Sequence, residues 1–148
     1  MNALEHGGVL DSSVGMKLVR LDEPLVAEGL QVIEMVRGEP HAWASPDIFD
    51  LECANAMAKA SRLAGLTADE ALEGSTLLRD LPQVRVETAR LTPSALSLAL
   101  GLGLSVYDAC YVVLAELLGL PLVTADERLA GALEGSALKV VRLREIDA

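Results

Sequence analysis

Residues 106–126 read VYDACYVVLAELLGLPLVTAD, and this stretch decides the class of fold. Its first part, 106–118, is apolar with helical spacing and stops at Gly119, a residue type that favours helix C-termini. Residues 121–124 then form a short apolar run, typical of a buried strand, which ends just before Asp126. A helix that leads directly into a buried strand indicates one unit of a parallel α/β sheet.

Helices and strands alternate in the same way along the rest of the chain. Strand-like runs are short and apolar or alternating, whereas helical runs repeat apolar residues every three or four positions. Thr67 and Glu70 form a capping-box pattern that predicts the start of one helix. We therefore expect strands at 9–10, 41–45, 84–86, 121–124 and 138–141, and helices at 14–21, 24–37, 46–65, 68–80, 92–100, 106–118 and 125–133. This order predicts an α/β fold in which a mostly parallel sheet is covered by helices on both faces.

The composition is typical of one domain that spans residues 1–148. Apolar residues make up 51% of the chain and aromatic residues only 3%, so we expect an aliphatic, largely helical core. No apolar run approaches the roughly twenty residues of a membrane-spanning helix, and the first residues lack a signal-peptide pattern. We expect a cytoplasmic protein without membrane contact.

The cysteines and histidines do not form a zinc-ligand pattern. Cys53 and Cys110 lie far apart inside apolar helical runs, and His6 and His41 are the only histidines. We expect both cysteines to be reduced and buried. The net charge of −10 also argues against a protein that coats nucleic acid, although it is compatible with a site that collects cations.

Four acidic residues stand out because of where they lie. Asp11 and Asp126 directly follow expected strands, and the carboxyl ends of parallel strands face the ligand crevice of such a sheet. Glu52 and Asp108 lie near the starts of expected helices, each between apolar residues. A buried carboxylate needs a basic partner, a proton or a metal ion.

The basic residues are too few to pair with every acid, since 12 Lys and Arg face 22 Asp and Glu. Converging carboxylates repel one another unless a divalent cation neutralises them. An all-oxygen ligand set selects Mg²⁺ or Mn²⁺, and either ion suits phosphodiester hydrolysis because it activates water and stabilises charge on phosphate. The predicted reaction class is therefore metal-assisted cleavage of a phosphodiester.

Three blocks of sequence resemble the PIN-domain family, and more closely the VapC-type toxins of toxin–antitoxin operons. They are VLDSSV at 9–14 followed by Lys17, PDIFDLECAN at 46–55, and VYDACY at 106–111 through LVTAD at 122–126. The resemblance extends over residues 9–144. Two departures, a short Gly-flanked first strand and Leu18 where many relatives have Trp, leave every candidate ligand in place.

The resemblance implies a three-layer α/β/α sandwich with metal-dependent endoribonuclease activity. It transfers metal-binding and catalytic roles to Asp11, Glu52, Asp108 and Asp126, and it implies one or two Mg²⁺ or Mn²⁺ ions. The usual setting of the family is a homodimer inhibited by a small antitoxin whose tail enters the active-site groove. The implied partners are therefore RNA, an antitoxin and a second copy of the chain.

Further residues are expected to support this site. Ser13, Asn55 and Thr124 are candidates for orienting the ligands or the phosphate, and Asn55 shares a helix face with Glu52. Basic residues close to the ligands in sequence form a possible RNA-contacting set in spite of the acidic total. That set consists of Lys17, Lys59, Arg62 and Arg128.

Simpler roles exist for each of the acids. Asp11 and Asp126 are also good helix N-caps, Asp108 suits the first turn of a helix, and Glu52 has a possible salt-bridge partner in Lys59. Two other functions are also open: a catalytically idle PIN-fold protein-binding module, and a nuclease or phosphatase that acts on a phosphoester other than RNA.

Overall fold

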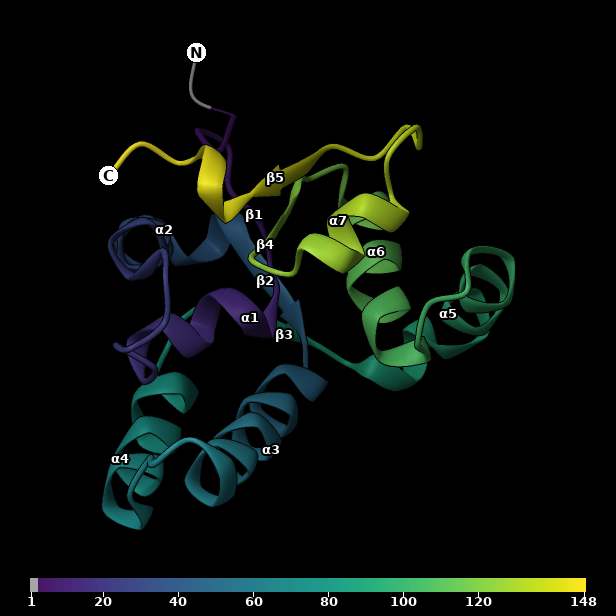
Figure 1. The fold of residues 1–148 in the computed structure, drawn as a ribbon. Helices are drawn as coiled ribbons and strands as arrows, with labels where there is room; N and C mark the ends of the chain where they lie inside the picture. The colour runs from purple at the N-terminus through teal and green to yellow at the C-terminus, as the bar shows by residue number, and fades with distance from the viewer. Residues whose placement is uncertain (1–2) are drawn as a thin grey trace.

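A computed structural model describes residues 3–148 and contains one five-stranded sheet (Figure 1). All neighbouring strands in it are parallel, and their order is β3-β2-β1-β4-β5. The strands are β1 (Gly8–Leu10), β2 (Trp43–Pro46), β3 (Val84–Val86), β4 (Leu122–Thr124) and β5 (Val140–Arg142).

The strand order reverses direction between β1 and β4, which pair through Val9 with Leu122 and Leu10 with Val123. The chain runs from β1 outward to β3 at one edge, and then returns to β4 on the other side of β1. In open parallel sheets, ligands bind outside the carboxyl ends of the strands at such a reversal point. Asp11 and Asp126 follow the two strands that flank it.

Helices cover both faces of the sheet. One side carries α1 (Ser12–Gly15), α2 (Val26–Gly38), α3 (Ile48–Leu63) and α4 (Ala68–Arg79), and the other carries α5 (Thr88–Leu102) and α6 (Val106–Leu118) (Figure 1). The short helix α7 (Glu127–Ala132) packs near β4 and β5, and 3₁₀ turns occur at Met16–Leu18, Pro40–Ala42 and Leu143–Glu145. The architecture is the expected three-layer α/β/α sandwich.

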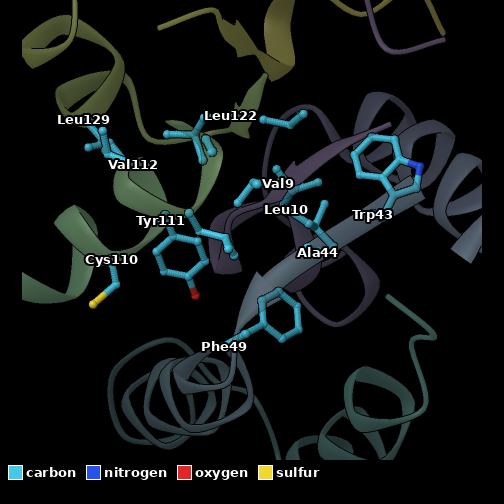
Figure 2. Packing of buried hydrophobic residues seen from close by; sticks show 14 of the residues in the cluster. Val9, Leu10, Trp43, Ala44, Phe49, Cys110, Tyr111, Val112, Leu122 and Leu129 are labelled. Atoms are coloured by element: carbon cyan, nitrogen blue, oxygen red, sulfur yellow. The ribbon is translucent and has the colours of Figure 1, made fainter. Parts of the chain in front are cut away.

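The core extends over both faces of the sheet, and α6 on one of these faces contacts β1, β2 and β4. All seven residues from Ala109 to Ala115 are buried, because this helix is apolar around most of its circumference. Figure 2 shows Tyr111 and Val112 of α6 and Phe49 of α3 among the buried side chains around Val9 and Leu10 of β1. Cys53 and Cys110 are free and buried, as expected.

Some element boundaries differ from the predictions. Helix α5 begins at Thr88 rather than at residue 92, because the Thr88 N–H donates to Asp47 Oδ1 at 3.0 Å across the chain; Pro93 consequently lies inside the helix. The helix expected at 14–21 becomes the short α1 followed by a 3₁₀ turn, and the strand expected at 41–45 begins only at Trp43.

Across residues 3–148, no single helix is long and apolar enough to cross a membrane. The helices α5 and α6 meet that length and composition only as a pair bent by 112°.

Candidate active site

Asp11 lies directly after β1 and is only 4% exposed. Its side chain does not cap α1; Oδ2 instead accepts hydrogen bonds from Ser13 Oγ at 2.5 Å and from Thr124 Oγ1 at 2.8 Å. The same two hydroxyls accept from the backbone N–H groups of Ala125 and Asp126, which ties Asp11 to the end of β4. Within residues 3–148, the Asp11 carboxylate accepts two hydrogen bonds, and both are made to Oδ2. Oδ1 is therefore available to another ligand.

The surroundings of Asp11 disfavour the ionised form of its carboxyl group. Burial raises the pKa of this carboxyl, and the hydrogen bonds from Ser13 and Thr124 lower it in part. The carboxylates of Asp108 and Asp126 raise the pKa further, because like charges disfavour ionisation. A cation at this position would remove both unfavourable effects.

Glu52 lies on α3, and its Oε1 accepts a hydrogen bond from the Tyr111 hydroxyl at 2.7 Å. Tyr111 belongs to α6 and is completely buried, and Figure 2 shows its hydroxyl pointing toward α3. Desolvation raises the pKa of Glu52, the bond from Tyr111 lowers it, and Asp11 and Asp108 raise it. Within residues 3–148, Glu52 forms no ion pair with Lys59, so the salt-bridge interpretation is wrong.

Asp108 and Asp126 face the same guanidinium group. Asp108 lies in the first turn of α6, and its Oδ2 accepts from Arg128 Nη2 at 2.9 Å. Asp126 Oδ1 caps α7 by accepting from the backbone N–H groups of Arg128 and Leu129, which confirms the capping interpretation. The other oxygen of Asp126, Oδ2, lies 3.6 Å from the same Arg128 nitrogen.

The four candidate carboxylates thus influence one another at one mouth of the sheet. The charges of Asp108 and Asp126 raise the pKa of Asp11, and those of Asp11 and Asp108 raise the pKa of Glu52. In this conformation, no three His, Cys, Asp or Glu side chains of residues 3–148 adopt an arrangement that would hold a metal ion, so a closed cage is not formed. The donors nevertheless fit Mg²⁺ or Mn²⁺ chemically, because all are oxygens and the most buried carboxylate keeps one oxygen free of hydrogen bonds.

The predicted flanking residues of α3 lie along its exposed side. Asn55, Lys59 and Arg62 are all exposed and follow Glu52 toward the end of the helix. Within the described chain, Lys59 and Arg62 form no ion pair. Their positive charges are therefore available to a ligand.

Lys17, one of the predicted RNA-contacting residues, is buried in this structure and is not exposed for such a contact. Lys17 is only 6% exposed, and its Nζ lies 3.1 Å from Glu23 Oε1. Its aliphatic stem packs against Gly29 of α2, where an added Cβ would lie 2.6 Å from Lys17 Cβ and Cγ. Lys17 lies in the 3₁₀ turn Met16–Leu18, where its neighbour Met16 is also buried.

Sequence reasoning did not assign a site role to Tyr111. The residue lies three positions after Asp108 in α6, so both project from the same side of the helix. The available signal was a tyrosine inside the apolar run that follows Asp108, because a buried Tyr hydroxyl usually needs a partner.

Comparison with known proteins places this chain among recognised relatives. Its residues 8–132 match the family model described as PIN domain. Ribonuclease VapC3 of Pyrobaculum aerophilum is 39% identical over 89 residues, which cover 57% of this chain and 66% of that protein. Ribonuclease VapC3 of Mycobacterium tuberculosis (strain CDC 1551) is 42% identical over 94 residues, covering 62% of this chain and 65% of the relative. The match thus spans just under two thirds of these curated relatives.

Two solved structures share the fold. The crystal structure of PAE2754 from Pyrobaculum aerophilum superposes with a TM-score of 0.69 at 23% identity, covering 97% of this chain and 94% of the other. A toxin-antitoxin complex from Klebsiella pneumoniae gives a TM-score of 0.60 at 16% identity, covering 91% and 97%. At these identities the two structures bear on the fold alone, and they agree with the three-layer architecture. With a family match over most of its length, this chain belongs to the PIN domain family.

Proposed function

We propose that this protein is an endoribonuclease that depends on Mg²⁺ or Mn²⁺ and acts as the toxin of a toxin–antitoxin pair. The observation that carries the proposal is the buried Asp11 carboxylate at the reversal point of the sheet, close enough to Asp108, Asp126 and Glu52 for their charges to interact. The name ribonuclease, borne by two relatives with about 40% identity, supports RNA as the substrate.

In this proposal the metal ion is held by Asp11, Glu52 and Asp108, and Asp126 completes the shell or positions water. When bound, the ion would supply an activated water and stabilise negative charge on the phosphate. Ser13 and Thr124 keep the Asp11 carboxylate in one orientation through their hydrogen bonds. Tyr111 of α6 does the same for Glu52 of α3.

The RNA backbone would approach along α3. Lys59 and Arg62 are exposed on this helix, without an ion pair in residues 3–148, and Asn55 lies between them and Glu52. Such positions suit phosphate contacts, which orient a nucleic acid without reading its sequence. Because the whole chain carries a charge of −10, binding would depend on this local patch and weaken with added salt.

The proposed partners are a small antitoxin and a second copy of this chain, all in the cytoplasm. The toxin-antitoxin title of the Klebsiella pneumoniae structure and the VapC3 names support the antitoxin. The face formed by α5 and α6 supports the homodimer, because residues 91–107 contain no charged side chain in an otherwise acidic protein. Leu100 of α5 and Leu117 of α6 are 79% and 71% exposed.

The test is cleavage of a labelled structured RNA by purified protein free of antitoxin, with Mg²⁺, Mn²⁺ or EDTA. Asp108→Asn should reduce cleavage at least about 100-fold, because it removes a ligand charge without changing side-chain size. Asp80→Asn, at the exposed end of α4, is the matched control and should cleave normally.

Parallel reactions with single-stranded DNA and a small phosphoester address the other functions. Preference for DNA or the small ester would replace the ribonuclease proposal with another phosphoesterase. Full activity of Asp108→Asn, or activity of the wild type in EDTA, would exclude the metal mechanism. Capture of an antitoxin without cleavage of any substrate would favour the protein-binding module.

A further inference from the structure

Arg128 extends from α7 across the mouth of the candidate site. Its backbone N–H donates to Asp126 Oδ1 at 3.0 Å, which fixes the start of the side chain. Its Nη2 lies 2.9 Å from Asp108 Oδ2 and 3.6 Å from Asp126 Oδ2. The guanidinium therefore bridges two helices through two of the four candidate metal ligands.

The other arginines near α7 pair elsewhere. Arg142 pairs with Glu127 and Glu134, and Arg144 pairs with Glu127, so these ion pairs involve no candidate ligand. Within residues 3–148, Arg128 is the only cation whose ion-pair partners are both candidate ligands. Its position is thus specific to the site.

We propose that Arg128 is a built-in competitor for the metal: its guanidinium holds Asp108 and Asp126 in the metal-free protein, and a divalent cation displaces it. This inference rests on the proposed metal site. A divalent ion on Asp108 Oδ2 would lie within a few ångströms of the guanidinium at 2.9 Å, so the two cations repel each other and compete for this oxygen.

The side chain is free to make this exchange. It is 67% exposed, whereas that of Asp108 is only 17% exposed, so the arginine can move into solvent while the carboxylate stays in place. Among the described residues, the guanidinium donates no hydrogen bond apart from the one to Asp108. Once displaced, it would lie free at the mouth, where the sequence predicts a contact with RNA.

The exchange has a thermodynamic signature. If Arg128 pairs with the ligands only in the metal-free state, removing it destabilises that state and leaves the metal-bound state unchanged. By linkage, the loss of metal-free stability must equal the gain in metal affinity. A residue with a merely structural role would lower the stability of both states equally.

Mn²⁺ alone serves as the probe, and free Mn²⁺ is counted by electron paramagnetic resonance during titration of the whole chain. Arg128→Gln should bind Mn²⁺ about threefold to tenfold more tightly than the wild type, as expected for loss of competing, partly exposed ion pairs. It should also melt at a lower temperature in EDTA and at the wild-type temperature in saturating Mn²⁺. Arg144→Gln removes the same charge from an ion pair that does not include a ligand, and should change affinity less than about twofold.

Three results would overturn the inference. Equal Mn²⁺ affinity of wild type and Arg128→Gln would exclude competition while leaving the proposed metal site intact. An equal increase in Mn²⁺ affinity in Arg128→Gln and Arg144→Gln would show that loss of any nearby positive charge strengthens binding. Displacement of Arg128 by the metal would then not be needed to explain it. Absence of Mn²⁺ binding by the wild type would overturn both this inference and the proposed function.

Discussion

Asp11 is the residue in which burial and charge conflict most directly. It is 4% exposed, and both burial and the neighbouring Asp108 and Asp126 raise its pKa. We predict that Asp11→Asn raises the stability of the metal-free protein by on the order of 1 kcal/mol, since Asn keeps an oxygen acceptor without the charge. Urea unfolding in EDTA measures this.

The same variant should lose the stabilisation by Mg²⁺ and the cleavage of RNA, because its metal ligand is gone. Ser13→Ala is a useful comparison, since it removes a hydrogen bond to Asp11 and keeps the charge. It should retain part of the Mg²⁺ stabilisation. An Asp11→Asn protein less stable than the wild type in EDTA would contradict the argument.

The raised pKa values of Asp11 and Glu52 also predict a pH dependence. A carboxyl with a higher pKa in the folded state binds more protons there than in the unfolded chain. Its stabilising effect is therefore complete below the unfolded pKa and is lost as pH rises through the folded pKa. In EDTA, the stability advantage of Asp11→Asn over wild type should therefore widen as the pH rises above about 4, the unfolded-state pKa of an Asp carboxyl.

Mg²⁺ should reverse that trend, because metal binding requires the ionised carboxylates. The increase in melting temperature on adding Mg²⁺ should thus be larger at neutral than at acidic pH. Differential scanning fluorimetry at neutral and at acidic pH, with and without Mg²⁺, measures this increase in melting temperature. A Mg²⁺ effect that is constant with pH would show that these carboxyls are not the ligands.

Tyr111 gives a test of ligand orientation. Tyr111→Phe keeps the buried ring and removes only the hydroxyl that donates to Glu52 Oε1. We predict that RNA cleavage falls about tenfold or more, the usual cost of losing a group that orients a metal ligand. Tyr107→Phe, on the exposed side of the same helix, should cleave at the wild-type rate. Equal activity of all three proteins would count against the role of Tyr111.

At the scale of elements, α2 packs closely on the 3₁₀ turn that carries Lys17. A Cβ at Gly29 would lie 2.6 Å from Lys17 Cβ and Cγ, which are too close to the backbone to move freely. We predict that Gly29→Ala lowers the free energy of unfolding by about 1–3 kcal/mol, as overpacking does elsewhere. Gly38→Ala at the end of the same helix meets nothing within 4 Å and should be neutral or slightly stabilising. Urea unfolding of both variants decides the comparison.

At the scale of the whole molecule, homodimer formation is expected at the part of the surface that carries no charged side chains. The uncharged segment 91–107 and the exposed Leu100 and Leu117 form the face proposed for the homodimer. Light scattering after size exclusion should give twice the chain mass of 15.6 kDa for the wild type. Leu100→Glu should shift it toward one chain mass, because two buried carboxylates would oppose each other. Leu72→Glu, at a position that is 69% exposed on α4, should leave the mass unchanged.

The sequence by itself determined the features that depend on local pattern. The parallel sheet follows from alternating helices and strands, and α6 (Val106–Leu118) begins and ends where predicted because Ser105 and Gly119 are strong end signals. The capping box of Thr67 and Glu70 likewise starts α4 at the expected residue. Local hydrogen bonding and apolar periodicity suffice for such features.

Only the tertiary structure decided which side chains meet across the sequence. Tyr111 reaches Glu52 from 59 residues away, and Arg128 crosses from α7 to Asp108 on α6. Lys17 turns into the protein although a basic residue is ordinarily expected at the surface. The directions of these side chains depend on how the helices pack against the sheet. The spacing of residues within one helix or strand contains no information about that packing.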